Sequence, residues 1–305
     1  MEYITEARKK QIDRIRKTKR RKRHMRRIAM LLCLVLLAAA AVRGTWFALW
    51  TVAAGRPQKA ESAAAVVETA ETSSRIQAEN TLPARELSQD EKLACIQRDD
   101  SYPDQLKEMA GKNSETIDFV YDYPKLKNEV WTVDLTEESR ADQVPLLMQW
   151  DERWGYGSYS GGFLGYTGCG PTALSMVILY LTDDATATPA AVAAYAESAG
   201  YSVPGSGSSW TLISEGCEHY GLHAEEVAMM EDRIKTKLDE GCPIIVNVGP
   251  GDFTDSGHYM VITGYDSEGF IINDSNSRAI SEKRWTFEQL NGQVRNLWAM
   301  TRQAS

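Results

Sequence analysis

A cysteine between two glycines, followed by a proline and a run of helix-forming residues, is the feature that most constrains this chain. It lies in residues 166–180, which read Tyr-Thr-Gly-Cys-Gly-Pro-Thr-Ala-Leu-Ser-Met-Val-Ile-Leu-Tyr. Proline is tolerated in the first turn of a helix, because its missing N–H needs no partner there. The apolar residues after it recur at helical spacing, so one face of the predicted helix is buried. Cys169 is therefore predicted to lie at or just before a helix N-terminus.

Such a position favours the ionised form of a thiol. The unpaired N–H groups and the dipole at a helix N-terminus attract negative charge, which can lower a cysteine pKa from its usual value of ~8.5. Gly168 and Gly170 are interpreted as leaving room for another molecule to approach the sulfur of Cys169. A reactive thiol is one interpretation of this stretch. A small buried cysteine that opens a core helix is the other.

The distribution of charge separates the first 27 residues from the rest of the chain. The 305 residues carry a net charge of −8, but residues 1–27 hold 13 Lys and Arg against three acids. The remaining residues hold 21 Lys and Arg against 39 Asp and Glu, a balance of −18. An acidic body argues against a nucleic-acid-binding protein. With 43% hydrophobic and 25% charged residues, the composition is that of a globular protein.

The five cysteines form neither a CxxC pair nor a metal-ligand spacing with the four histidines. This pattern argues against a zinc site and against a disulfide-dense scaffold. Cys217 and Cys242 can pair, although cysteines at such positions are more often simply buried. His219 and His223, four residues apart near the end of a predicted helix, more often mark a solvated face than a metal site. No motif for phosphate, nucleotide or calcium is present, so no cofactor is expected.

Residues 28–50 are predicted to cross a membrane as a signal-anchor. Ile28–Val42 holds 15 residues without a charge, and the segment is long enough to span if Arg43 snorkels to the outer interface. The basic flank at residues 1–27 should remain cytoplasmic, which sends the rest of the chain outside. A cleaved signal peptide is the alternative, because Ala38–Ala41 resembles a cleavage region. Its basic n-region would be unusually long, so we expect the segment to stay uncleaved.

The remaining residues divide into three regions. Residues 51–89 are rich in Ala, Glu, Ser and Thr, which predicts a low-complexity extracellular stalk. Residues 90–129 are predicted to form a helical prelude of two or three short helices, with breakers at Tyr102-Pro103 and Tyr123-Pro124. Residues 130–305 form the main domain.

The main domain is predicted to place its helices before its strands. The helices are expected at 170–182, 188–199, 209–220 and 228–240. The strands are expected at 243–248, 258–265, 270–273 and 296–300. This order predicts an α+β domain.

His258 opens an apolar predicted strand directly after a turn-rich stretch, residues 249–257. A histidine at the mouth of a buried strand is held rigidly and can still face a cleft. A nucleophilic cysteine needs a base that takes its proton and later protonates the leaving amine. Cys169 and His258 are therefore more informative together than either is alone.

A third group should orient the imidazole of His258. A hairpin of strands 258–265 and 270–274 would bring Asp274 back toward that ring, so Asp274 is our choice. Asn273 and Asn276 are its rivals. Because successive side chains of a strand point to opposite faces, at most one of Asn273 and Asp274 can face the histidine.

Hydrolysis through a thiolate also requires donors for the developing oxyanion. The backbone N–H of Cys169, at the helix start, is one donor. Gln149 is the natural side-chain candidate for a second, because the polar and aromatic loop 151–168 can fold back and bring it near. The alternative is a surface glutamine that precedes a tryptophan.

Four segments together resemble the stand-alone bacterial relatives of the bacteriocin-processing, double-glycine leader peptidases. They are Leu-Leu-Met-Gln-Trp-Asp-Glu-Arg-Trp-Gly at 146–155, Gly-Tyr-Thr-Gly-Cys-Gly-Pro-Thr-Ala at 165–173, Gly-His-Tyr-Met-Val-Ile-Thr-Gly-Tyr at 257–265 and Ile-Asn-Asp-Ser at 272–275. The leader peptidases are cysteine peptidases of the papain-like clan. The resemblance extends over residues 144–300 and implies an α+β papain-like fold, in which a helical part carries the Cys and an antiparallel sheet carries the His and Asp.

The resemblance also assigns roles by position. It implies that Cys169 is the nucleophile, His258 the base, Asp274 the orienting acid and Gln149 the oxyanion glutamine. The chain departs from the pattern in two places. Ser275 stands where the family often has proline, and the insert between Gln149 and Cys169 is longer than in the leader-processing members.

We therefore expect a single-pass membrane protein whose extracellular papain-like domain hydrolyses peptide bonds through a thioester on Cys169. Its expected partners are a peptide or protein substrate and the membrane, but no nucleic acid; the oligomeric state stays open. One alternative keeps the same dyad in a cell-wall amidase or transglutaminase-like acyl transferase. Another is a non-catalytic surface binding module that uses the aromatic loop 150–166.

Overall fold

The computed structural model describes residues 86–303 of the chain. The chain divides into two compact units, Met1–Pro83 and Ala84–Ser305. The predicted basic tail, the predicted membrane span at 28–50 and most of the predicted stalk therefore lie outside the described residues. Within residues 86–303, no helix combines the length and the hydrophobicity that crossing a membrane requires.

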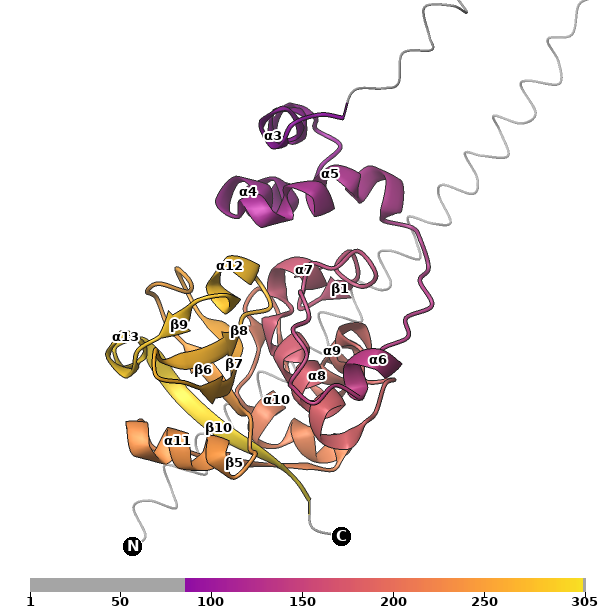
Figure 1. Cartoon of the computed structure of the whole chain (residues 1–305). Coiled ribbons are helices and arrows are strands. Elements are labelled where there is room, and N and C mark those ends of the chain that lie inside the picture. The colour runs from indigo at the N-terminus through magenta and orange to yellow at the C-terminus, as the bar shows by residue number, and fades with distance from the viewer. Residues whose placement is uncertain (1–85, 304–305) are drawn as a thin grey trace, which may run out of the picture. The chain divides into compact units, whose positions relative to one another are not determined.

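The described part begins with three helices, which we call the prelude (Figure 1). They are α3 (Gln89–Arg98), α4 (Asp104–Lys112) and α5 (Ile117–Leu126), with the 3₁₀ turn η1 (Ser114–Thr116) between the last two. A capping box between Ser88 and Glu91 starts α3. The predicted break at Tyr123-Pro124 is wrong, because α5 includes Pro124 and ends two residues later. So close to the end of a helix, a proline removes only one hydrogen bond of the helical ladder.

The main domain contains eight further α-helices and a second 3₁₀ turn among the described residues. They are α6 (Thr136–Ser139), α7 (Leu164–Thr167), α8 (Cys169–Thr182), α9 (Pro189–Ala199), α10 (Thr211–Ser214), η2 (Gly216–Tyr220), α11 (Glu231–Asp239), α12 (Arg278–Ser281) and α13 (Phe287–Asn291). The single helix predicted at 209–220 is wrong, because the chain breaks at Glu215 into α10 and η2.

Six strands form one antiparallel sheet in the order β5-β10-β6-β7-β8-β9. Their bounds are β5 (Leu222–Glu226), β6 (Ile244–Val248), β7 (His258–Tyr265), β8 (Phe270–Asn273), β9 (Arg284–Trp285) and β10 (Val294–Arg302). Two small hairpins join β1 (Ser158–Tyr159) to β2 (Gly162–Phe163) and β3 (Ser202–Val203) to β4 (Gly207–Ser208). The strand β5 is not predicted from the sequence. It carries His223, whereas His219 lies on η2, so the two histidines do not share a helix.

Alternation along the strands divides the hydrophobic core of the main domain into two clusters. On β7, Tyr259 and Val261 pack in the cluster that contains α8 and α9, whereas Met260 and Ile262 pack in the cluster that contains α11 and α13. Full burial of such side chains contributes roughly 1.5–3 kcal/mol each to folding. Cys217 belongs to the first cluster and Cys242 to the second, and both are free thiols. The sheet therefore separates the two cysteines that the sequence left as a possible pair.

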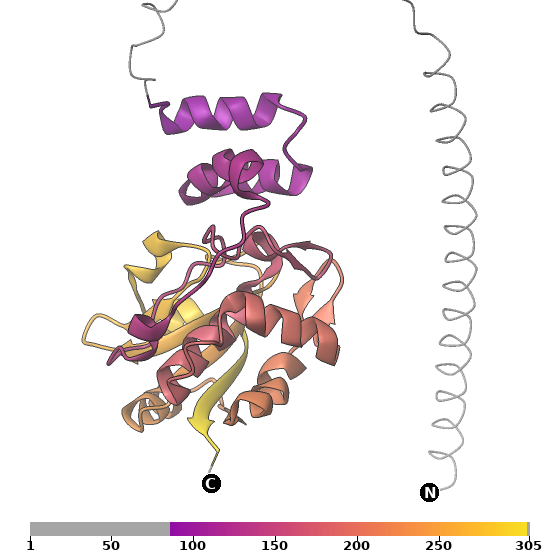
Figure 2. The ribbon, with the colours of Figure 1, turned by 90° about the vertical axis from the view of Figure 1, so that its right-hand side faces the viewer.

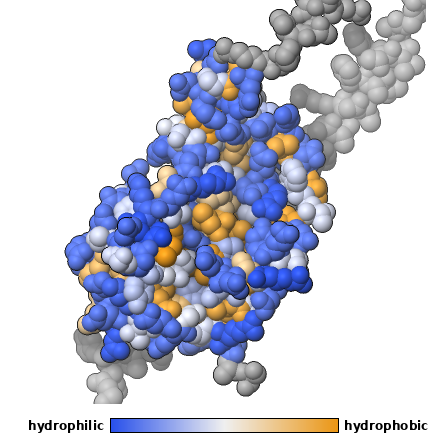
Figure 3. Space-filling view, in the orientation of Figure 1, coloured by the Kyte–Doolittle hydropathy of each residue, from blue (hydrophilic) through white to orange (hydrophobic). Residues whose placement is uncertain are grey.

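A third cluster joins the prelude to the main domain. It combines Leu106, Ile117 and Phe119 of the prelude with Met148 and Trp150, which precede the cysteine helix. In Figure 2 the three prelude helices stack at one end of the main domain. Most of the face in Figure 3 is hydrophilic, with smaller hydrophobic patches between the polar residues.

Candidate active site

Cys169 is the first residue of α8, where the sequence predicts it. Its backbone N–H therefore lies outside the intrahelical hydrogen-bond ladder. The two flanking glycines are explained by the protein's own packing. A Cβ at Gly168 would lie 2.4 Å from the carbonyl oxygen of Leu164, and one at Gly170 would lie 2.4 Å from Oγ of Ser208. The interpretation that these glycines leave room for another molecule is therefore wrong: the protein itself occupies that space.

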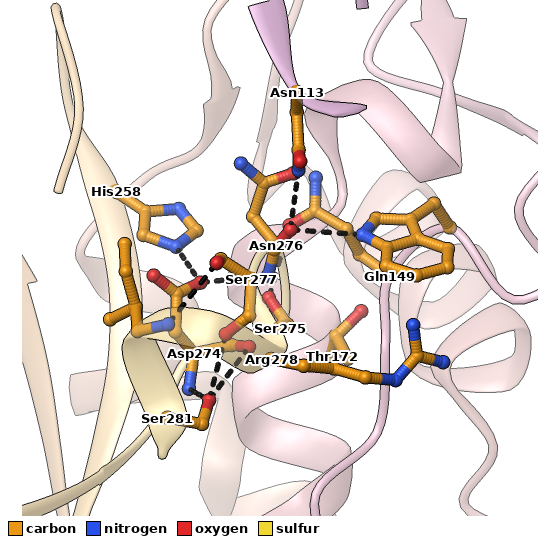
Figure 4. A network of polar contacts seen from close by, with 12 residues as sticks. Asn113, Gln149, Thr172, His258, Asp274, Ser275, Asn276, Ser277, Arg278 and Ser281 are labelled. Atoms are coloured by element: carbon orange, nitrogen blue, oxygen red, sulfur yellow. Dashed lines mark hydrogen bonds and ion pairs between the residues drawn. The ribbon is translucent and has the colours of Figure 1, made fainter. Parts of the chain in front are cut away.

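His258 is the first residue of β7 and lines the same cavity as Cys169, and its charge and hydrogen-bonding capacity lower the pKa of the Cys169 thiol. Its Nε2 lies 2.7 Å from Oδ1 of Asp274 (Figure 4). Because Nε2 is engaged by the carboxylate, Nδ1 is the ring nitrogen left for the sulfur. The imidazole thus connects a thiol from the helical part of the domain with a carboxylate from the sheet.

Asp274 follows β8 directly and is fully buried. The register pairs Val261 with Asn273, so Asp274 projects from the same face of the sheet as His258. Its Oδ1 also accepts the backbone N–H of Asn276 at 2.7 Å. Its Oδ2 is buried and has no hydrogen-bond partner among the described residues. A buried carboxylate with so few partners strongly favours a positive charge on the ring beside it.

The two rivals of Asp274 make other contacts. Asn273 donates from Nδ2 to the carbonyl oxygens of Val144 at 2.9 Å and Pro145 at 3.1 Å, on the opposite face of the sheet. Asn276 takes part through its backbone, whose N–H contacts Asp274. Of the three candidates, Asp274 is therefore the residue that the structure brings to His258.

The titration behaviour of the dyad follows from these contacts. Burial tends to raise the pKa of the Cys169 thiol, but the hydrogen bond and charge of His258, with backbone N–H groups of Tyr259 and Gly170, hold it below its usual value. Burial tends to lower the pKa of His258, but the charge and hydrogen bond of Asp274, followed by Cys169, raise it well above its usual value. Opposite shifts of this kind favour a thiolate–imidazolium pair near neutral pH.

Gln149 is buried and reaches the same site. Its Nε2 donates to the carbonyl oxygen of Gly165 at 2.9 Å and makes a longer contact of 3.4 Å with that of Tyr166. Its Oε1 accepts from Oγ of Ser275 at 3.0 Å, and its backbone N–H donates to the carbonyl oxygen of Ser275 at 2.8 Å. Ser275, the residue that departs from the family pattern, thus holds Oε1 of the Gln149 amide, while Nε2 contacts the backbone of the segment that leads to Cys169. We found no signal for this contact in the sequence.

Gln149, Cys169 and His258 line one cavity of about 390 Å³. The loop 251–257 forms another part of its wall, as does Tyr166. The prelude also contributes to this wall, through Met109, Lys112 and Asn113. The sequence leaves open whether the prelude supports or inhibits the cleft.

The other histidine pair plays no part in this cavity. His219 stacks on Tyr195 with ring centroids 4.2 Å apart, and His223 is exposed on β5. Throughout residues 86–303, no three His, Cys, Asp or Glu side chains gather closely enough to hold a metal ion.

The site combines a thiol, an imidazole that can take its proton and a carboxylate that orients the imidazole, and it lies in a cavity. Hydrolases that act through a thiol on acyl groups have this arrangement. Residues 141–305 match the model of the Peptidase_C39-like family, and this match spans more than half of the chain. The chain belongs to that family and is a cysteine peptidase. The resemblance stated from the sequence is thus confirmed.

Two solved structures are similar to parts of the chain. The peptidase domain of Streptococcus ComA, a bifunctional ABC transporter of a quorum-sensing pathway, is 20% identical over 45% of this chain and 93% of its own, with a TM-score of 0.37. A C39-like peptidase from Bacillus anthracis is 16% identical over 56% of this chain and 98% of its own, with a TM-score of 0.33. None of the curated proteins matches the chain.

Replacing Asp274 by asparagine is expected to lower the pKa of His258, because burial then acts on the ring without the opposing carboxylate. The imidazolium stabilises the thiolate less, so the pKa of Cys169 rises and the pH range in which the ion pair exists narrows from both sides. Turnover should fall by roughly 10²–10⁴-fold. The rate of Cys169 carbamidomethylation by iodoacetamide, followed against pH by mass spectrometry, measures both pKa changes.

Asp266→Asn is the matched control for this variant. Asp266 lies at the turn of the same hairpin, where it pairs with Arg284 at 2.6 Å on the surface. Its loss should leave the pH profile of Cys169 unchanged. A profile of Asp274→Asn that coincides with the wild type would show that Asp274 does not act on the dyad.

Proposed function

We propose that this protein is a membrane-anchored, extracellular cysteine peptidase that cleaves peptide bonds by a Cys-His-Asp mechanism. The observation that carries the proposal is that Cys169 and His258 line one cavity and that the ring of His258 is hydrogen-bonded to Asp274. In this proposal Cys169 is the nucleophile, His258 the general acid and base, and Asp274 the group that orients and charges the imidazole.

The first chemical step is attack of the Cys169 thiolate on the carbonyl carbon of the scissile bond. A C–S bond forms, and the carbonyl π electrons move onto oxygen. In this proposal the backbone N–H of Cys169 and Nε2 of Gln149 donate to the developing oxyanion, and Nε2 gives up its longer contact with the carbonyl oxygen of Tyr166. Support for this role of Gln149 comes from its place in the cavity wall and from Ser275, which engages its Oε1.

The imidazolium of His258 then gives its Nδ1 proton to the leaving nitrogen as the C–N bond breaks. The products of this step are a free amine and a thioester on Cys169. Water, deprotonated by the now neutral imidazole, attacks the thioester carbonyl and releases the carboxylic acid. The proton taken from water returns the histidine to its charged form, and the thiolate is regenerated.

The substrate class is tested by incubating the full-length protein with a peptide library and, separately, with purified peptidoglycan. Mass spectrometry in H₂¹⁸O should detect new peptide termini that carry ¹⁸O in the carboxyl group, and Cys169→Ala should remove them. Release of stem peptides from peptidoglycan alone would instead indicate an amidase. Products joined to an added amine, without ¹⁸O, would indicate an acyl transferase.

The anchoring part of the proposal depends on residues 1–50 of the sequence. An apolar segment at 28–50, preceded by 13 basic residues, fits the positive-inside rule for a signal-anchor with the C-terminal domain outside. We expect a membrane-impermeant, thiol-reactive electrophile to label Cys169 on intact cells. A tag at the N-terminus should stay protected from added protease. Labelling only after lysis, or loss of residues 1–41 from the isolated protein, would contradict this topology.

A further inference from the structure

The prelude is hydrogen-bonded to the turn that follows Asp274. Glu115 of η1 accepts three hydrogen bonds from that turn: from Oγ of Ser277 at 2.6 Å, and from the backbone N–H groups of Arg278 at 2.9 Å and Ala279 at 3.3 Å. Next to it, Nδ2 of Asn113 donates to the carbonyl oxygen of Asn276 at 2.8 Å (Figure 4). Residues more than 160 positions apart in sequence are thereby joined.

The same turn holds the carboxylate of Asp274 in place. The backbone N–H of Asn276 donates to Oδ1 of Asp274 at 2.7 Å, and Ser281 donates from Oγ to the carbonyl oxygen of Ser277 at 2.9 Å. Oγ of Ser281 also accepts the backbone N–H of Asp274 at 2.9 Å. A shift of the turn would therefore move the oxygen that faces His258.

The prelude also supports the other side of the cleft, the insert between Gln149 and Cys169. Phe119 stacks on Tyr156 with ring centroids 4.4 Å apart, and the hydroxyl of Tyr156 donates to the backbone carbonyl oxygen of Phe119 at 2.7 Å. A Cβ at Gly155 would lie only 2.8 Å from the Phe119 ring, and one at Gly165 only 3.0 Å from it. Glycine at these two positions of the insert therefore allows the Phe119 ring of the prelude to pack against the insert backbone.

We propose that the prelude is a permanent wall of the catalytic cleft and that Glu115 is a positioning residue, which sets Asp274 against His258 through the 274–279 turn. The inference rests on the proposed function of the Cys169–His258 pair. The hydrogen bonds of Glu115 and Asn113 end on the turn rather than on the dyad. The prelude therefore lines the cavity through Met109, Lys112 and Asn113 and leaves the sulfur accessible.

The test compares Glu115→Ala with Glu115→Gln and with the matched control Asp118→Ala, all in the full-length protein. Asp118 is also a prelude carboxylate, but it accepts from Gln89 and Lys92 within the prelude. Carbamidomethylation of Cys169 by iodoacetamide is followed against pH by mass spectrometry, with the exposed thiol of Cys95 as the internal reference. This measurement needs no substrate, and it reports how much of the Cys169 thiol is ionised at each pH. Turnover of a peptide that the wild type cleaves is measured in parallel.

In Glu115→Ala we expect kcat to fall about tenfold, because small displacements of catalytic groups have large effects on rate. KM should change much less. The pKa of His258 should fall and that of Cys169 should rise, so that less thiolate reacts in the acidic range. Glu115→Gln keeps one acceptor oxygen and should lie between Glu115→Ala and the wild type. Asp118→Ala should behave as the wild type, both in the pH profile and in kcat.

Two results would overturn the positioning role. One is a Glu115→Ala profile and kcat equal to those of Asp118→Ala. The other is a rise in turnover, which would make the prelude an inhibitory segment. A wild-type protein whose Cys169 reacts no faster than Cys95 at acidic pH would instead refute the proposed function. The two failures are therefore distinguishable in the same experiment.

Discussion

Replacing Cys169 by alanine should abolish peptide hydrolysis, with turnover reduced by at least ~10⁴-fold, because no other thiol lines the cavity within the described residues. The sulfur forms the bond that splits one difficult hydrolysis into two easier steps, and no remaining group in the site replaces it. The measurement is kcat/KM on a cleavable peptide, together with labelling by a thiol-reactive electrophile. Both signals should disappear in this variant.

Cys95→Ala is the control for this experiment. Cys95 is the exposed free thiol of α3, and its loss should leave turnover within the error of the wild type. Alanine at position 169 removes only a sulfur at the start of α8, so the unfolding transition should stay cooperative. Turnover that survives in Cys169→Ala would eliminate the thioester route altogether.

Replacing His258 by alanine is expected to reduce turnover by roughly 10³–10⁴-fold. Burial then raises the pKa of the Cys169 thiol without opposition from the imidazolium. The thiolate becomes scarce near neutral pH, and the leaving nitrogen loses its proton donor. Stopped-flow alkylation against pH separates the first effect from the second, because alkylation requires the thiolate but no proton donor.

The double variant Cys169→Ala/His258→Ala should be no slower than the worse of the two single variants, since the pair acts as a unit. His223→Ala provides the matched control, because His223 is exposed on the edge strand β5. A His258→Ala protein with an unchanged alkylation profile would show that the ring does not ionise the thiol.

The sequence predicts the local elements around the site well. The strands that start at His258 and Phe270 begin at the expected residue, and the helix that starts at Cys169 begins one residue before the expected range 170–182. Their signals are carried by neighbouring residues: a proline in the first turn, apolar residues at helical spacing and a turn between two apolar runs. Such signals act over a few positions and do not depend on the rest of the fold.

Predictions that depend on how other parts of the chain pack around a residue are less successful. The sequence suggests that Gly168 and Gly170 leave access to the sulfur, whereas protein atoms fill the space beside both. The helix predicted at 209–220 breaks at Glu215, and β5 is added to the sheet edge beside β10. A short polar edge strand with mixed burial has no clear alternation, so the sequence pattern gives little indication of it.

The residue types that can perform the chemistry, and the approximate starts of the elements around them, follow from the sequence. Which acid reaches the imidazole, what holds the amide of Gln149 and whether the prelude forms part of the cleft follow from the folded chain alone. The cause is separation along the chain. Asn113 and Asn276 are 163 positions apart, and Gln149 and Ser275 are 126 apart. Contacts between such residues arise from the packing of whole elements, which no local pattern encodes.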